Sequence, residues 1–147
     1  MRARDLLAPF PTVTLGTSAL AAARLLAEQD LPGLIVVDDE GHPLTILPGT
    51  QVLRLVVPRY CQEDPALARV IDEAHADRFA GELGERSVRE CLPEQPRELP
   101  ITDTNATVLE MAALMARTRS PLIAVVDDRK LVGAVTLQTL LGRALEA

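Results

Sequence analysis

The histidines, serines, cysteines and paired acids of this 147-residue chain show no spacing that assembles a catalytic group. The two histidines, His42 and His75, are interpreted as a turn residue and a helix-face residue rather than as general bases. The serines Ser18, Ser87 and Ser120 stand in no Gly-x-Ser-x-Gly context, and no phosphate-binding loop occurs. The sequence therefore indicates a protein that is not an enzyme. A small enzyme of unrecognised class remains an alternative, which needs a titratable pair poised in a cleft.

Paired acids and cysteines are the remaining candidates for metal or redox chemistry. Asp38–Asp39 and Asp127–Asp128 are expected at hairpin tips, where such side chains usually point to water, and no further ligand spacing accompanies them. The two cysteines, Cys61 and Cys91, show no Cys-x-x-Cys spacing, so we expect neither a zinc site nor a disulfide framework. They are interpreted as small buried or half-buried residues in a reducing cytoplasm.

The composition narrows the choice of partners. The net charge is −6, and an acidic chain repels phosphate backbones, so nucleic acid is not expected as a partner. Aromatic residues make up only 2% of the chain, so the core must be built from Leu, Val, Ile and Ala.

No apolar run approaches the ~18 residues of a membrane span, and the N-terminus has no apolar signal-peptide region. We expect a cytoplasmic protein without membrane insertion.

The chain contains an internal duplication. The clearest matched pair of segments is "LPGLIVVDDEGHPLTIL" at 31–47 and "SPLIAVVDDRKLVGAVT" at 120–136. Three further pairs recur in the same order: 3–9 with 88–94, 12–29 with 98–117, and 47–56 with 135–145. This order predicts two repeats, at 1–57 and 87–147, joined by a helical connector at 58–86. Within the connector, an inserted helix is predicted from about 65 to 83.

Each repeat is predicted to be a β-α-β-β-α unit preceded by one short helical turn. In repeat 1, Ser18 or Thr17 is the candidate N-cap of the first helix. In repeat 2, Thr107 and Glu110 form a capping box that opens the helix at Val108. A strand that is apolar on both faces follows, and an acidic turn leads back into a second strand. The closing helices are predicted over 49–57 and 137–146.

The apolar faces of these helices can also be assigned from spacing. In repeat 2, the helix that opens at Val108 has two apolar edges at helical spacing, one of a leucine with alanines and one of methionines with a leucine. This helix is therefore predicted to be buried on much of its surface. The first edge comprises Leu109, Ala112, Ala113 and Ala116; the second comprises Met111, Leu114 and Met115. The corresponding stripe in repeat 1 comprises Leu20, Ala23, Leu26 and Ala27.

Burial explains why the unit is duplicated. A three-stranded sheet with two helices covers one face of the sheet only, and the other apolar face needs a partner. Two repeats related by a pseudo-twofold axis bury those faces on each other. The sequence therefore predicts an α/β (α+β) fold built from two such repeats.

The repeated pattern resembles the cystathionine-β-synthase (CBS) domain. The resemblance rests on an apolar strand, Val-Val-Asp, an acidic turn, and a Gly-apolar-apolar-Thr segment that opens a helix; "PLIAVVDDRKLVGAVTLQTLL" at 121–141 is the clearest stretch. It implies a tandem pair that forms one compact unit, commonly a homodimer. Such pairs commonly bind AMP, ADP, ATP or S-adenosylmethionine in the clefts between the repeats and regulate a partner enzyme, channel or transporter without catalysing a reaction.

The family's ribose-binding motif has Thr or Ser three residues before an Asp. Repeat 2 keeps the first position as Thr136 and has Thr139 in place of the Asp. Repeat 1 has Pro48 and Gln51 at these positions, and Thr45 where the preceding Gly is expected. In repeat 2, a Thr hydroxyl accepts fewer and weaker hydrogen bonds than the carboxylate of the family pattern. In repeat 1, Pro offers neither a hydroxyl nor an N–H, so this site is expected to lack the family's hydrogen bonds to ribose and phosphate.

The resemblance therefore places the candidate ligand site beside Thr136 and Thr139. These residues are expected to face the segments that lead into the first strand of each repeat, Thr12–Val13 and Pro100–Ile101. Thr136 at a helix N-terminus is a candidate anion contact, with plain helix capping as the alternative. Arg119 is either a phosphate contact or a solvated surface residue.

Besides the enzyme alternative, two non-catalytic functions remain open at this stage. The first is a regulatory, ligand-sensing module that binds an adenosine-type nucleotide or S-adenosylmethionine and acts on a separate, unknown target enzyme or transporter. The alternative is a structural dimerisation or interaction module whose nucleotide site is degenerate. In either case we expect a homodimer, with the helices over 19–29, 49–57, 108–118 and 137–146 as candidate contact surfaces.

Overall fold

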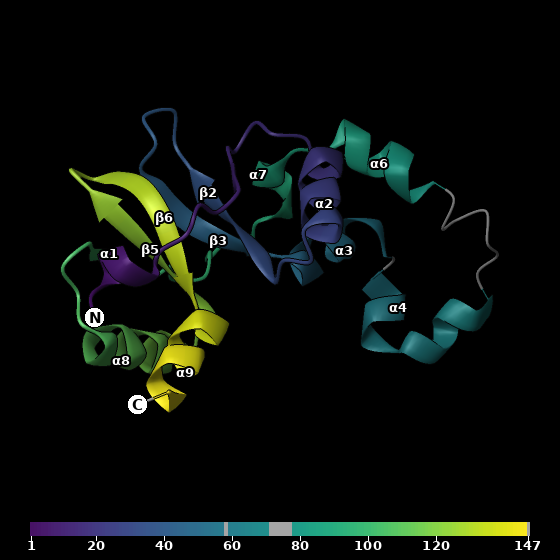
Figure 1. The fold of residues 1–147 in the computed structure, drawn as a ribbon. Helices are drawn as coiled ribbons and strands as arrows, with labels where there is room; N and C mark the ends of the chain where they lie inside the picture. The colour runs from purple at the N-terminus through teal and green to yellow at the C-terminus, as the bar shows by residue number, and fades with distance from the viewer. Residues whose placement is uncertain (58, 71–77, 147) are drawn as a thin grey trace. The chain divides into compact units, whose positions relative to one another are not determined.

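A computed structural model describes residues 1–57, 59–70 and 78–146 (Figure 1). It contains two three-stranded sheets, with strand orders β1-β2-β3 and β4-β5-β6. Contacts within the chain divide it into two compact units, which are described separately. Unit 1 comprises Met1–Thr12, Ile35–Ile46 and Arg97–Ala147; unit 2 comprises Val13–Leu34 and Leu47–Pro96.

Both repeats show the predicted order of elements, which confirms the mixed α/β fold. Repeat 1 consists of α1 (Ala3–Leu6), β1 (Thr12–Val13), α2 (Ala19–Glu28), β2 (Gly33–Val37), β3 (Pro43–Pro48) and α3 (Gly49–Val56). Repeat 2 consists of α7 (Val88–Cys91), β4 (Ile101–Asp103), α8 (Val108–Thr118), β5 (Leu122–Asp127), β6 (Lys130–Thr136) and α9 (Leu137–Leu145). Between them lie α4 (Arg59–Glu63), the 3-10 helix η1 (Pro65–Val70) and α6 (Phe79–Glu85).

Unit 1 is built around the sheet β4-β5-β6, in which β5 pairs parallel with β4 and antiparallel with β6. Its two faces are covered differently. Helices α1, α8 and α9 cover one face (Figure 1), in a core that comprises Ala3, Leu6, Ala106, Met111, Met115, Ile123, Val125, Val135 and Leu140. The other face packs against strands of repeat 1, in a core that comprises Ile35, Val37, Ile46, Leu99, Leu122, Ala124 and Ala134. The strands of the two repeats therefore share a core within unit 1.

The short first helix of each repeat pairs with the other repeat, a feature that the sequence analysis did not predict. In unit 1, the Ala3 amide of α1 donates to the carbonyl of Ala106, at 2.8 Å. In unit 2, the Val88 amide of α7 donates to the carbonyl of Thr17, also at 2.8 Å. These two bonds join equivalent positions of the repeats, so the exchange is reciprocal. It explains why α1 belongs to unit 1 and α7 to unit 2, whereas the segment Ile35–Ile46 joins unit 1 through the shared core.

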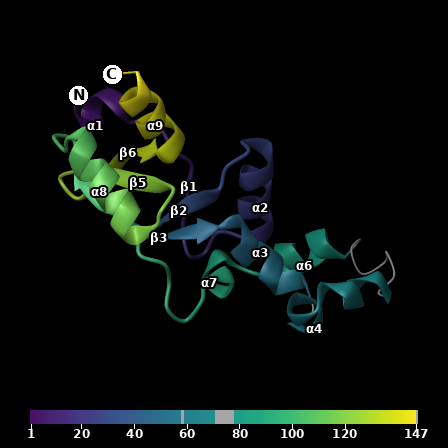
Figure 2. The same cartoon turned by 90° about the horizontal axis from the view of Figure 1, so that it is seen from below.

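Unit 2 holds α2, α3 and α7 against one another, with α6 packed on α2 and α3 (Figure 2). Ser18 is the N-cap of α2, and its hydroxyl accepts a hydrogen bond from the Ala21 amide at 3.0 Å. The equivalent N-cap of α8 in unit 1 is Thr107, which accepts from the Glu110 amide at 3.2 Å. Both predicted helix starts are confirmed, and Ser18 is chosen over Thr17.

Two predictions about helices need correction. Helix α8 is buried along one stripe rather than over much of its surface: Met111 and Met115 face the core, whereas Leu109 is 80% exposed. The reason is that α8 has a sheet on one side only. The helix predicted over 65–83 begins instead as the 3-10 helix Pro65–Val70, and α6 starts at Phe79. Residues 71–77, including His75, lie outside the described residues.

Helix length bears on the membrane expectation. Among the residues that the structure describes, none of the helices is both long and apolar enough to cross a bilayer.

Replacing Gly133 tests the exchange of first helices. The backbone of Ala8, just after α1, exchanges two 3.0 Å hydrogen bonds with Ala134 of β6. A Cβ at Gly133 would lie 2.7 Å from the Ala8 carbonyl oxygen, so Gly133→Ala should lower the free energy of unfolding by about 1–3 kcal/mol through overpacking. Urea denaturation measures the change.

Gly142→Ala on α9 is the matched control. No atom outside its own helical backbone lies within 4 Å of a Cβ added there, and replacing a helical Gly by Ala should stabilise by about 0.5–1 kcal/mol. Wild-type stability for Gly133→Ala would contradict the close approach of Ala8 to β6.

Candidate functional site

Two of the predicted contact segments lie at the same end of the sheet β4-β5-β6. Thr136, the last residue of β6, is paired with Leu122 at the start of β5. On the other side of β5, the Pro100 carbonyl accepts a hydrogen bond from the Ala124 amide at 3.0 Å, and Ile101 is paired with Ala124. Two strand spacings separate β4 from β6, so these segments are about 10 Å apart across the sheet.

This end of the sheet presents an apolar surface beside a hydroxyl. Ile101, Ala124 and Ala134 are in register across the three strands, so their side chains share one face of the sheet. Ala124 and Ala134 belong to the core shared by the repeats, whereas Ile101 is 45% exposed. Thr136 lies two residues after Ala134 and so has the same orientation. Of these apolar side chains, Ile101 is the exposed one, and the fully buried Leu122 and Ala124 of β5 lie between it and Thr136.

Thr136 is the N-cap of α9. Its hydroxyl accepts a hydrogen bond from the Thr139 amide at 3.2 Å and donates to the Thr139 hydroxyl at 3.1 Å. The next amide, that of Leu137, donates to the carbonyl of Pro121 at 2.8 Å. The structure thus brings Thr136 and Thr139 together in a cap, which is the alternative considered from the sequence. Binding of an anion here needs the Thr136–Thr139 hydroxyl pair to reorient, and it stays a prediction.

The other predicted contacts are placed as follows. Thr12 and Val13 form β1 of the other sheet, with Thr12 exposed and Val13 buried in the core. Arg119 is exposed and ends α8 in the left-handed conformation, with φ of 56°. It lines a groove of about 380 Å³ between α8 and α9, next to Pro121 and Leu137. None of these placements establishes a ligand contact.

Repeat 1 has a different set of groups at the matching positions. The Thr45 hydroxyl is buried and donates to the Arg97 carbonyl at 2.7 Å. Pro48 is the N-cap of α3, without a side-chain hydrogen bond to the helix. Gln51 lines a polar pocket of about 880 Å³ in unit 2, together with Arg54 and Arg59.

This polar pocket and its arginines were not predicted from the sequence. Arg54 lies three residues after Gln51 and so on the same side of α3, a spacing that offered a usable signal. The pocket also contains Glu63, whose carboxylate lies 3.6 Å from the Arg59 guanidinium, so its charges are mixed. It suits a polar ligand that carries both donors and acceptors.

Cys91 also lines this pocket. Burial, reinforced by the neighbouring Glu90 carboxylate, raises the pKa of the Cys91 thiol. A thiol with a raised pKa is a poor nucleophile at neutral pH. Within the described ranges, no group of three or more His, Cys, Asp or Glu side chains is arranged to hold a metal ion.

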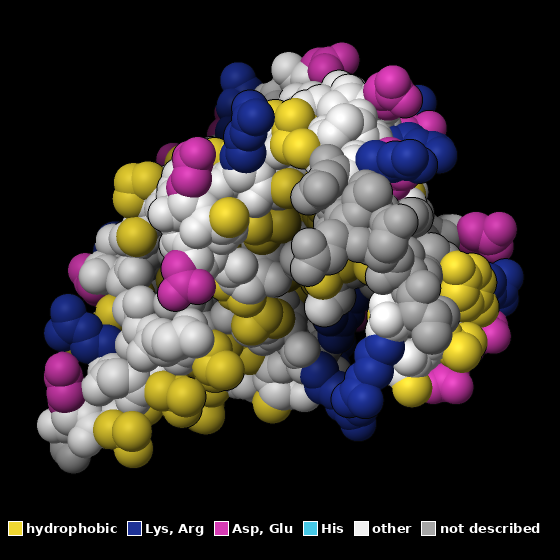
Figure 3. Space-filling model, turned by 90° about the vertical axis from the view of Figure 1, so that its right-hand side faces the viewer, with side chains coloured by type: hydrophobic (Ala, Val, Ile, Leu, Met, Phe, Trp, Pro, Cys, Tyr) yellow, Lys and Arg dark blue, Asp and Glu magenta, His cyan; other side chains and the backbone are white. Residues whose placement is uncertain are grey.

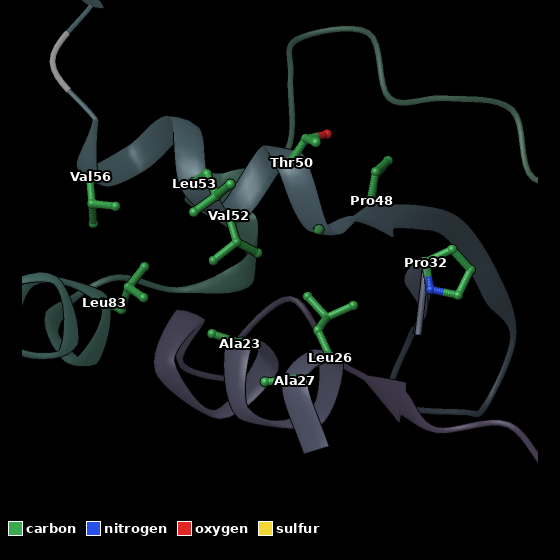
Figure 4. Close-up of a pocket in the computed structure, with 11 residues that line it drawn as sticks. Ala23, Leu26, Ala27, Pro32, Pro48, Thr50, Val52, Leu53, Val56 and Leu83 are labelled. Atoms are coloured by element: carbon green, nitrogen blue, oxygen red, sulfur yellow. The ribbon is translucent and has the colours of Figure 1, made fainter. Parts of the chain in front are cut away.

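Each repeat also has an apolar groove between its two main helices. In unit 2, α2 and α3 enclose about 500 Å³, into which Leu26, Val52 and Leu53 project (Figure 4). In unit 1, Met115, Leu140 and Leu141 occupy the same repeat positions along the 380 Å³ groove between α8 and α9.

The surface charges are mixed. On the face drawn in Figure 3, basic and acidic side chains are scattered among hydrophobic and other ones. A continuous basic surface, as nucleic acid requires, is not seen on the described part of that face.

Comparison with known sequences identifies the family. The sequence model of the CBS domain matches residues 3–57 and 96–146, which cover both repeats. The chain belongs to the CBS-domain family. No curated protein sequence matches it.

Solved structures agree with this assignment. A CBS domain-containing protein of unknown function from Kribbella flavida is 49% identical, with 99% of each chain covered and a TM-score of 0.91. The CBS domain of a membrane protein from Sphaerobacter thermophilus is 26% identical, with 97% of this chain and 86% of that chain covered and a TM-score of 0.73. CBSX2 from Arabidopsis thaliana, solved in complex with AMP, shares the fold at 21% identity, with 99% and 96% covered and a TM-score of 0.68.

The β2–β3 turn generates a pH prediction. The Asp38 carboxylate accepts hydrogen bonds from the backbone amides of His42 and Glu40, both at 2.9 Å, and the His42 ring nitrogen lies 3.1 Å away. These interactions, the His42 amide bond first, lower the pKa of Asp38, although desolvation acts in the opposite direction. A carboxyl with a lowered folded pKa stabilises the fold above its unfolded pKa of about 3.9, and this stabilisation is lost as the pH falls through the folded pKa.

Asp38→Asn removes the titrating group from this turn. The loss of stability between pH 6 and pH 3, measured by urea denaturation, should therefore be smaller in Asp38→Asn than in the wild type. An unchanged loss would show that the turn does not hold the charged carboxylate preferentially.

Replacing Arg119 tests whether this residue has a structural role. A left-handed conformation costs a non-glycine residue about 1 kcal/mol, so Arg119→Gly should raise the free energy of unfolding by about that amount. Arg117→Gly, in the last turn of α8, should lower the same quantity by about 1 kcal/mol. Thermal and urea denaturation measure both changes. A loss of stability in Arg119→Gly would contradict a purely surface role for its side chain.

Proposed function

We propose that this protein is a non-catalytic regulatory module that binds an adenosine-type nucleotide or S-adenosylmethionine and acts on a separate partner protein. The observation that carries the proposal is the match of both repeats to the CBS domain. AMP in the structure of CBSX2 supports a nucleotide as the ligand class.

The end of the sheet β4-β5-β6 is the proposed ligand site. The nucleobase packs on the exposed side chain of Ile101, beside Pro100, and the ribose or phosphate reaches Thr136 and Thr139 across β5. The macrodipole of α9 adds positive electrostatic potential at the N-terminus of this helix, which favours an anionic group there. Thr139 in place of an aspartate leaves the ribose hydroxyls with a weaker acceptor than the family pattern provides, so the affinity is modest.

A second candidate function is a dimerisation or interaction module with a degenerate nucleotide site. The specific observation in its favour is that the Thr136 and Thr139 hydroxyls already satisfy each other in the α9 cap. Under either function we propose a homodimer as the working form, with target recognition by a protein that remains to be identified. We also propose the cytoplasm as its location.

Isothermal titration calorimetry of the intact chain with AMP, ADP, ATP and S-adenosylmethionine tests the proposed function. At least one of them should bind, and Thr136→Val should weaken that binding roughly 10–100-fold, because it removes a hydrogen bond to a charged or polar ligand group. A bound ligand should also raise the melting temperature in proportion to its saturation.

Thr107→Val is the matched control, because Thr107 caps α8 with the same 3.2 Å geometry and lies outside the proposed site. Both variants should lose about 1 kcal/mol of stability through the lost cap, but only Thr136→Val should lose affinity. Absence of binding heat and of any thermal shift with all four ligands at millimolar concentration would reject ligand sensing in favour of the interaction module.

A further inference from the structure

Helix α6 of the connector adds a third wall to the α2–α3 groove of repeat 1. It packs on both α2 and α3, and its Leu83, which is only 8% exposed, lines the groove. Figure 4 shows Leu83 at one end of the space and Pro32 at the other, with Leu26 and Val52 pointing into the space from α2 and α3. Two helices of the repeat and one helix of the connector therefore surround a pocket of about 500 Å³.

The lining of this pocket is apolar and uncharged. Among the described residues that line it, Thr50 is the one with a polar side chain, and in Figure 4 its hydroxyl points away from α2. An ionised group buried here would lose its hydration without gaining a partner of opposite charge. The lining therefore suits an uncharged, apolar molecule rather than a nucleotide or another anion.

The volume of the pocket favours a small molecule over a helix of a partner protein. An α-helix about 10 Å wide, with a rise of about 1.5 Å per residue, occupies about 120 Å³ per residue. The space left beside α6 holds about one turn of such a helix, which is too short to be stable in isolation. Pockets of about 300–1,000 Å³ are instead typical of small-molecule ligands.

The equivalent groove of repeat 2 differs in both respects. It measures about 380 Å³, and its described lining comes from α8, α9 and the Arg119–Pro121 segment, without any residue of the connector. Arg119 brings a charge to this groove, and Ser120 brings a hydroxyl. The wall formed by α6 therefore distinguishes the repeat-1 pocket, and the repeat-2 groove serves as its internal control.

We propose that the pocket between α2, α3 and α6 binds a small, uncharged molecule with an aliphatic or aromatic skeleton. Leu53 lines the pocket and is 54% exposed, so a bound molecule removes apolar surface of the protein from water as well as its own. The molecule contacts repeat 1 and the connector together, so its binding stabilises the packing of α6 on the repeat.

This site is separate from the proposed nucleotide site. Every residue that lines the pocket belongs to unit 2, whereas Pro100, Ile101, Thr136 and Thr139 belong to unit 1. The inference therefore goes beyond the proposed function and does not depend on whether a nucleotide binds.

Fluorescence titration of the intact chain with N-phenyl-1-naphthylamine, an uncharged probe whose emission rises in apolar surroundings, tests the inference. The wild type should bind the probe saturably, with one probe per chain, and millimolar AMP should not displace it. Ala23→Phe places a ring in the pocket from α2 and should weaken binding about 10-fold or more, because the ring competes with the probe for the same space. Ala112→Phe, the same change at the equivalent position of the repeat-2 groove, should leave the affinity unchanged.

Leu83→Ala provides a second variant, which leaves the α2 and α3 walls intact and removes the apolar contact from α6. It should also weaken probe binding, and the rise in melting temperature that the probe gives the wild type should shrink in this variant and in Ala23→Phe. Absence of saturable binding, displacement of the probe by AMP, equal weakening by Ala112→Phe, or full affinity in Leu83→Ala would overturn the inference. Because the probe is titrated without nucleotide, failure of the nucleotide titrations leaves these results unaffected.

Discussion

The strands β2 and β5 are apolar on both faces, and this constrains the rest of the fold. Residues Gly33–Val37 are all buried, as are the first four residues of β5. Each strand therefore needs an apolar layer on either side of its sheet. For β5, the helices of repeat 2 supply one layer and strands of repeat 1 supply the other. Duplication of the unit provides that second layer within a single chain.

The exchange of first helices follows the same logic at the edge of the sheet. Ala8 pairs with β6, and Gly133 is the residue whose missing side chain lets the two backbones approach. Gly133 is also the glycine of the CBS-domain pattern, three residues before Thr136. The segment from Gly133 to Thr136 therefore pairs with the residue that follows α1 and also provides the N-cap of α9. The structural and proposed ligand-binding roles of β6 therefore occupy adjacent residues.

The order of elements in each repeat was predictable from sequence, because it depends on local signals. The continuous apolar runs predict β2 and β5, the acidic turns predict the hairpins, and Ser18 and Thr107 mark helix starts. The exchange of α1 and α7 was not predictable. It depends on backbone hydrogen bonds between residues of different repeats, which lie far apart in the sequence. Similarly, helical spacing alone did not distinguish Leu109, which is exposed, from the buried Met111.

The candidate site was predictable only in part. The spacing of Thr136 and Thr139 indicated a helix cap or an anion contact, and the structure adds that Pro100 and Ile101 reach the same end of the sheet. The polar pocket around Arg54 and Arg59 was missed, because it combines α3 and α4 with the end of α7 and the segment after it, which no local pattern connects.

Native-state hydrogen exchange tests most directly the central claim that strands of the two repeats share one core within unit 1. The account predicts that the amides of Ile35 and Val36 in β2 and of Ala124 and Val125 in β5 exchange only through global unfolding, with the same free energy of opening. Opening of β2 at a free energy several kcal/mol below that of β5 would contradict a common core, since the two repeats would then unfold independently.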